Sequence, residues 1–148
     1  MSSSQTLMLK IAAGLWVIWG LVHALAGILV LSGTTPEGFQ AIADGTDPSL
    51  LVGPYPDAVG AVLGQHAWNL LWFGVATTIG AVFIWKADMT AIWVTAMVGG
   101  LADLGYFIFL DLPGHVNFIP GTLMTLVSGA AILLSGFVWF AHRSPRSG

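Results

Sequence analysis

The chain has 148 residues, of which 56% are hydrophobic and only 7% are charged, and its formal net charge is −3. Soluble domains carry about 25% charged residues, so this composition leaves too little charge to cover a water-facing surface. The four Lys and Arg residues argue against nucleic-acid binding, and the lack of cysteine excludes disulfides, thiolate metal sites and dithiol chemistry. We therefore expect one membrane domain over residues 1–148.

Four apolar segments reach the ~20 residues that a helix needs to cross the hydrocarbon core of a bilayer. They cover residues 11–31, 59–85, 90–110 and 118–141. Backbone groups within lipid have no water to pair with, so these segments are predicted to be helices. The first is too long for the apolar part of a cleaved signal peptide and is expected to remain as a span. The sequence thus predicts an all-α, antiparallel bundle of four transmembrane helices.

The connection between the first two spans, residues 32–58, is the only long one. Thr35 is expected to cap a short helix that runs from Pro36 to about Ala43, with the proline at its first position. In this amphipathic helix, Phe39 and Ile42 would lie either on the membrane surface or across the mouth of the bundle. A plain connector without a function is the alternative interpretation.

The basic residues all fall at one end of the predicted bundle, and they are Lys10, Lys86, Arg143 and Arg146. The opposite end carries acidic residues and no basic ones, namely Glu37, Asp44, Asp47, Asp57 and Asp111. Loops rich in Lys and Arg stay in the cytoplasm. We therefore predict a multi-pass protein of the inner (cytoplasmic) membrane, with both termini in the cytoplasm and residues 32–58 outside.

Polar residues inside the spans carry the functional signal, because an ionisable group in lipid is energetically expensive. His23, His66, Asp103 and Thr125 each lie seven or eight residues from the outer end of their span. At 1.5 Å per residue this places all of them roughly 10–12 Å below the outer boundary. The agreement predicts one polar site within the bundle, on its periplasmic side.

Imidazole and carboxylate groups suit zinc, copper(II) or iron(II). We therefore predict a transition-metal site formed by His23, His66 and Asp103, in an enzyme that carries out a redox or hydrolytic step on a small or lipid-soluble substrate. His115 or Tyr106 would act as the acid or base, or as an additional ligand. The groups expected to hydrogen-bond the ligands are Gln65, Asn69, Asn117 and Thr125.

Other interpretations remain open. A b-type haem would take His23 and His66 as its axial ligands. A pocket lined by Trp19, Trp68 and Trp72 would hold a flat or long apolar ligand such as a quinone or a carotenoid. In a third interpretation the polar residues only join the helices of a non-catalytic subunit or binding protein. Its glycine-rich faces would then serve assembly into a homo-oligomer or a larger complex in the lipid.

Overall fold

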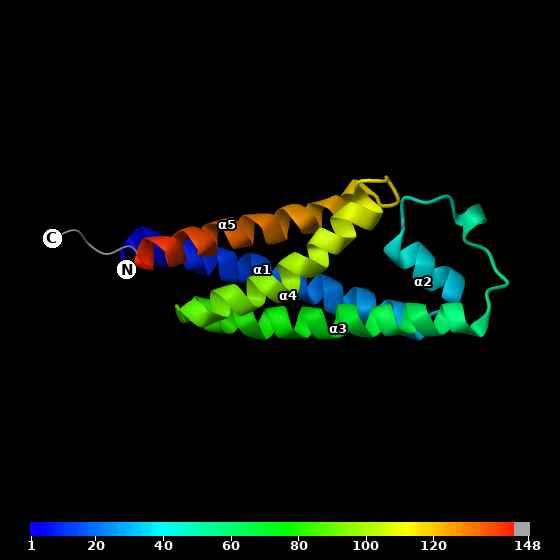
Figure 1. The fold of residues 1–148 in the computed structure, drawn as a ribbon, viewed down its shortest axis with the longest axis horizontal. Helices are drawn as coiled ribbons and strands as arrows, with labels where there is room; N and C mark the ends of the chain where they lie inside the picture. Colours follow the sequence, from blue (N-terminus) through cyan, green and yellow to red (C-terminus); the bar gives the residue numbers. More distant parts are fainter. Residues whose placement is uncertain (144–148) are drawn as a thin grey trace.

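The computed structural model describes residues 1–143 and consists of helices joined by loops (Figure 1). The long helices are α1 (Ser3–Ser32), α3 (Asp57–Trp85), α4 (Met89–Tyr106) and α5 (Leu123–Arg143). π-helical turns extend two of them, Phe107–Asp111 after α4 and Phe118–Thr122 before α5. Within the described residues, these four helices with their extensions are long and apolar enough to cross a membrane. The predicted all-helical chain with four apolar, membrane-length helices is confirmed.

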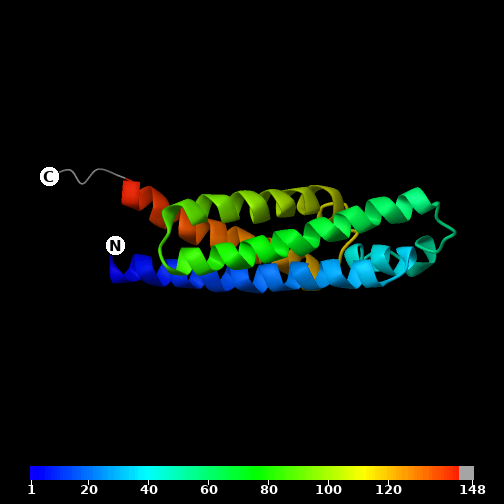
Figure 2. The same ribbon diagram turned by 90° about the horizontal axis from the view of Figure 1, so that it is seen from below.

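The long helices run up and down, so the N-terminus and the end of α5 lie at the same end of the bundle (Figures 1 and 2). We call this end the basic end, because Lys10, Lys86 and Arg143 lie there, whereas Arg146 is outside the described residues. The opposite end carries the short helix α2 (Thr35–Ile42), and we call it the α2 end (Figure 1). The two ends thus differ in charge as the sequence predicts.

Glycines bring α1 and α3 into close contact, and the two helices lie side by side in both ribbon views (Figures 1 and 2). A Cβ atom added at Gly27 would lie 2.6 Å from the carbonyl oxygen of Ala67, and one at Gly20 would lie 2.6 Å from that of Gly74. Small residues of this kind allow backbones of membrane helices to approach each other. His23 stands between the two α1 glycines and is therefore held at a defined position against α3.

Helix α4 approaches α3 closely only toward the basic end. There a Cβ atom added at Gly80 would collide with the side chain of Thr95. From this point α4 crosses the bundle and diverges from α3 toward the α2 end (Figure 1). The main apolar core contains the fully buried Trp16 and Trp19 of α1. The divergence of α3 and α4 leaves space beyond this core.

Helix α2 begins one residue earlier than predicted, with Thr34 and not Thr35 as its cap. The carboxylate of Glu37 accepts hydrogen bonds from the Thr34 backbone N–H (2.7 Å) and hydroxyl (2.8 Å), which lower the pKa of Glu37. The prediction chose Thr35 as the cap because threonine is a common capping residue, and it therefore missed this capping box. Phe39 and Ile42 pack onto a buried apolar cluster made of Val30, Leu63 and Ala67. The helix therefore lies across the mouth of the bundle.

The segment after α2 is tied to the loop between α4 and α5. The backbone N–H of Gly45 donates to the carbonyl oxygen of His115 at 2.9 Å. A carboxylate oxygen of Asp44 accepts from the Asn117 backbone N–H at 2.8 Å, and the Asn117 amide donates to the Asp44 carbonyl oxygen at 2.9 Å. We call these four residues the loop latch. Together with α2, the latch covers the α2 end.

Candidate functional site

Asp103 of α4 is the one acidic or basic side chain buried within residues 1–143, with 3% of its surface exposed. Its Oδ2 accepts a hydrogen bond from the indole Nε1–H of Trp19 on α1 at 2.8 Å. Its Oδ1 faces Nε2 of His23, also on α1, at 3.7 Å. The His23 ring stacks on the Trp19 ring with centroids 3.6 Å apart and an interplanar angle of 19°. These contacts join α1 to α4 within the bundle.

The hydrogen bonds of His23 define where its proton lies. Nδ1 is 2.8 Å from the carbonyl oxygen of Trp19, and a carbonyl oxygen only accepts, so Nδ1 carries a proton. Nε2 and the Asp103 oxygen therefore attract each other only if a further proton lies on one of them. The pair is then either imidazolium with carboxylate or imidazole with carboxylic acid. Both forms are neutral overall, which suits a buried position within lipid.

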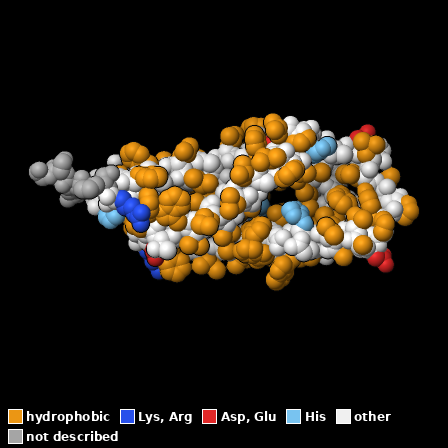
Figure 3. Space-filling model, viewed as in Figure 1, with side chains coloured by type: hydrophobic (Ala, Val, Ile, Leu, Met, Phe, Trp, Pro, Cys, Tyr) orange, Lys and Arg blue, Asp and Glu red, His pale blue; other side chains and the backbone are white. Residues whose placement is uncertain are grey.

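Two adjoining cavities lie beside this pair. One of about 70 Å³ lies beneath α2, and one of about 240 Å³ lies between α3 and α4. Both are lined by His23, His66, Leu70, Asp103 and Tyr106. We call the combined space the polar cavity. In Figure 3 it appears as a hollow with a histidine side chain at its edge.

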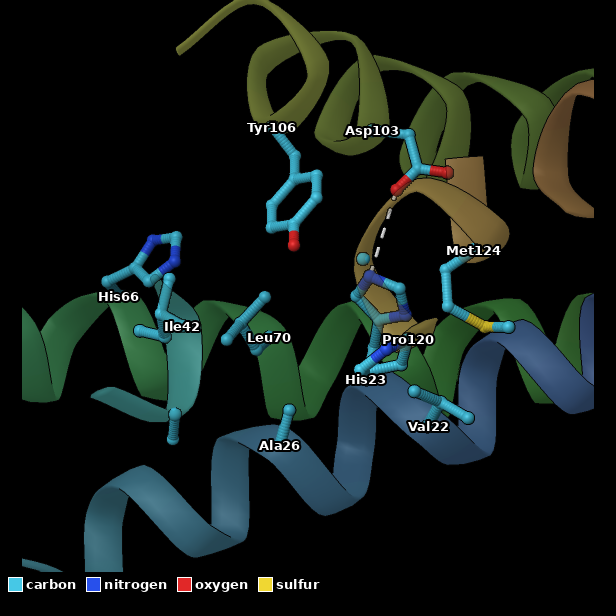
Figure 4. A pocket seen from close by; sticks show the side chains of 12 residues that line it. Val22, His23, Ala26, Ile42, His66, Leu70, Asp103, Tyr106, Pro120 and Met124 are labelled. Atoms are coloured by element: carbon cyan, nitrogen blue, oxygen red, sulfur yellow. Dashed lines mark ion pairs between the residues drawn. The ribbon is translucent and has the colours of Figure 1, made fainter. Parts of the chain in front are cut away.

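Three polar groups from α3 and α4 reach the polar cavity. In Figure 4, the Tyr106 hydroxyl points from α4 into the space between His66 on α3 and His23 on α1. Oδ1 of Asp103 is buried and has no hydrogen-bond partner within the described chain. Neither Tyr106 nor His66 makes a side-chain hydrogen bond to another residue of that part of the chain. The cavity therefore offers acceptor and donor groups on otherwise apolar walls.

Comparisons of the chain with protein-family models, curated proteins and solved structures gave no match. A functional assignment therefore depends on the site itself.

The structure brings together two of the three predicted metal ligands, His23 and Asp103. His66 lines the same cavity, but no group of three His, Asp or Glu residues within 1–143 is placed to hold a metal ion. The predicted metal site is therefore not supported by the arrangement. Both ring nitrogens of His23 face a partner, so a metal or haem iron would have to displace Asp103 or the carbonyl oxygen of Trp19. Counting residues along the spans predicted a shared depth but not these contacts.

The two predicted acid–base residues separate in the structure. Tyr106 lines the polar cavity, whereas His115 belongs to the loop latch, where its Nδ1 lies 3.5 Å from the Thr46 hydroxyl. Asn117 is likewise bonded to Asp44 and lies outside the cavity. These loop positions depend on partners about 70 residues away, which the sequence does not reveal.

On α3, His66 is the one predicted residue that lines the cavity, and the other predicted residues lie elsewhere on the helix. His66, Leu70 and Phe73 follow the helical repeat and line the cavity. Trp68 and Trp72 point outward with 57% and 41% of their surfaces exposed. Asn69 accepts a hydrogen bond from the Trp72 indole at 3.1 Å, and Gln65 is exposed. Of the three tryptophans expected around a cofactor, only Trp19 reaches the site, as a hydrogen-bond donor to Asp103.

On α5, the residue beside the buried carboxylate is Ser128. Its hydroxyl donates to the carbonyl oxygen of Thr125 at 3.1 Å and lies next to Asp103. The predicted Thr125 side chain is buried without a hydrogen-bond partner in the described chain and does not line the cavity. Ser128 lies one turn after Thr125, on the same face of α5. Sequence reasoning missed Ala41 of α2 and Met124 of α5, which complete the smaller cavity.

Proposed function

We propose that this protein binds a lipid-soluble small molecule in the polar cavity. Asp103, Tyr106 and His66 would contact the polar head of that molecule. The observation that carries the proposal is the convergence of Asp103, Tyr106 and His66 on one cavity, where neither Tyr106 nor His66 makes a side-chain hydrogen bond within residues 1–143. A polar group in an apolar cavity without a hydrogen-bond partner costs about 1–3 kcal/mol, which a ligand that pairs with it would recover.

The chemistry of the walls supports this class of ligand. Small-molecule sites are mostly apolar and carry a few converging polar groups, as this cavity does. A hydroxyl and a neutral imidazole both donate and accept hydrogen bonds, so Tyr106 and His66 suit carbonyl and hydroxyl groups of a ligand. The larger cavity of about 240 Å³ exceeds the ~150 Å³ that accommodates benzene in an engineered protein. A quinone-type head, a single ring with oxygen substituents, matches this size and chemistry.

The proposal includes an orientation in the membrane. We infer that the basic end faces the cytoplasm, because Lys10, Lys86 and Arg143 lie there and positive residues stay inside. Asp103 and His66 would then lie toward the periplasmic face of the inner membrane. A cysteine-accessibility map would test this orientation directly, since the chain has no native cysteine.

Binding is tested with the purified protein in lipid nanodiscs and an alkyl-substituted benzoquinone as the probe, followed by quenching of tryptophan fluorescence. We expect saturable binding that Tyr106→Phe weakens about 2- to 10-fold, which corresponds to one hydrogen bond of ~0.5–1.5 kcal/mol. The matched control is Tyr55→Phe at the other tyrosine, which contacts Phe39 and lies outside the cavity. This control should bind like the wild type.

Two outcomes would contradict the proposal. Non-saturable quenching of the wild type would mean that the probe only dissolves in the lipid. A near-stoichiometric transition metal on the same sample, lost in Asp103→Asn, would return the site to metal binding.

A further inference from the structure

Two routes lead to the polar cavity, one from the water at the α2 end and one from the lipid between α3 and α4. Helix α2 narrows the first, because its Ala41 and Ile42 line the smaller cavity and Phe39 and Ile42 pack onto the apolar cluster beneath. The loop latch adds hydrogen bonds of 2.8–2.9 Å across the neighbouring loops. At about 70 Å³, the space beneath α2 is also too small for a ring.

The second route is open. α3 and α4 diverge toward the α2 end, and the larger cavity lies between them (Figures 1 and 3). Its apolar lining consists of Leu70, Phe73, Ala102, Gly105, Phe109 and Leu110. Phe109 is 74% exposed, which places this rim at the outer surface of the bundle. Because the surface of a membrane span faces hydrocarbon, this opening faces lipid.

Gly105 of α4 lies at the opening of the larger cavity between α3 and α4. A Cβ atom added at Gly105 would meet no described atom within 4 Å, although this residue lines the larger cavity. Gly105 is also the residue next to Tyr106 on α4, at the level of the polar groups. A side chain at this position would therefore begin in open space beside the larger cavity.

We propose that the ligand is a membrane-dissolved amphiphile that enters sideways between α3 and α4. Its hydrogen-bonding head, about one ring in size, lies against Asp103, His66 and Tyr106, and its apolar chain extends past Gly105 into the lipid. This inference rests on the proposed function, and it excludes water-soluble solutes as the natural ligand. It follows from an aqueous route that α2 narrows, a wider route between α3 and α4, and a buried carboxyl group, that of Asp103, at the end of the wider route.

The central experiment fills the opening. Gly105→Phe should weaken binding of the alkyl benzoquinone in nanodiscs at least about tenfold, because the ring occupies the path of the chain. The matched control is Gly129→Phe on α5, where an added Cβ atom likewise meets no described atom within 4 Å and which lines neither cavity. It should bind like the wild type. Thermal unfolding of both variants shows whether they fold, and Gly105→Leu serves as a smaller substitution.

A second measurement tests the opening without any ligand. Gly105→Cys introduces the only thiol of the chain. In nanodiscs a lipid-soluble maleimide should label it, a charged maleimide should not, and the benzoquinone should protect it.

The outcomes separate the two proposals. Saturable binding to the wild type with equal binding to Gly105→Phe overturns the lateral route and leaves the proposed function standing. Equal labelling of Gly105→Cys by the charged reagent also overturns it, since water then reaches the site. Selective lipid-soluble labelling with no saturable binding supports the lateral opening but contradicts the proposed function and, with it, the ligand assigned here.

Discussion

Helix α3 packs against its two neighbours in opposite ways. Toward α1, glycines at Gly20, Gly27 and Gly74 bring the backbones into contact over several turns. Toward α4, the close approaches lie at Gly80 against Thr95 and at Thr77 against Gly99, and the helices diverge beyond them toward the α2 end (Figure 1). Bulkier residues such as Phe73 then line the space between them. The polar cavity lies where these two helices diverge (Figure 1).

The largest expected effect comes from filling the closed interface. Gly27→Leu places a side chain against backbone atoms of α3, since a Cβ atom there would already lie 2.6 Å from the Ala67 carbonyl oxygen and 2.6 Å from the Leu71 nitrogen. Backbone atoms cannot move aside cheaply, so we expect destabilisation at or above the upper end of the ~1–3 kcal/mol typical of overpacking. Unfolding in detergent, followed by circular dichroism, measures this effect.

The control for this prediction lies on α3. Gly64→Leu introduces the same side chain where an added Cβ atom meets no described atom within 4 Å. Its stability should equal or exceed that of the wild type, because leucine favours a helix over glycine by up to about 1 kcal/mol. Equal destabilisation of the two variants would show that the α1–α3 contact does not decide the result, since leucine favours a helix more than glycine does.

A smaller effect is expected at the contact that joins α1 to the diverging α4. Asp103→Ala leaves the Trp19 indole N–H buried without its acceptor, which should reduce stability by about 1–3 kcal/mol. Asp103→Asn retains an acceptor oxygen and should lose less. Adding Trp19→Phe to Asp103→Ala removes the unpaired donor, so a double-mutant cycle should show a favourable coupling between the two sites. Strictly additive losses would show that this hydrogen bond does not stabilise the site.

The smallest effect is expected at the cover of the α2 end. The hydrogen bonds from Thr34 hold the pKa of Glu37 below its ordinary value of 4.5. A lowered folded-state pKa means that the cap contributes fully above pH 4.5 and is lost as the pH falls through the folded value. Amide hydrogen exchange of the first turn of α2, corrected for the intrinsic pH dependence, should therefore increase on acidification. Glu37→Gln should show no such dependence, and an equal response of both proteins would contradict the capping role.

Much of the fold was predictable because a bilayer imposes length and polarity on any chain that crosses it. The four apolar segments, the basic end and a short helix after the first span were all predicted from the sequence, although whether that helix lies over the bundle mouth was left open. The shared depth of His23 and Asp103 also came from counting residues, and in the structure the two side chains meet at 3.7 Å. Depth along a straight helix depends only on the rise per residue.

The rotation of each helix about its axis was not predictable in the same way. In a soluble protein, a polar outer face shows which side of a helix points inward. In α3 both faces are apolar, because one meets lipid and the other meets the bundle, so Trp68 and Trp72 gave no sign that they point outward. The position of His115 was not predictable either, because a backbone hydrogen bond from Gly45, in a distant segment of the chain, holds its loop.

The sequence by itself therefore determined the four apolar segments of membrane length, the basic end and the shared level of His23 and Asp103, since these depend on local length and polarity. Only the tertiary structure decided that Asp103 pairs with His23 and Trp19 and that His66 and Tyr106 face a shared cavity. It also decided that this cavity opens between α3 and α4. Those features depend on how closely helices pack, and the packing is governed by contacts between residues far apart in the chain.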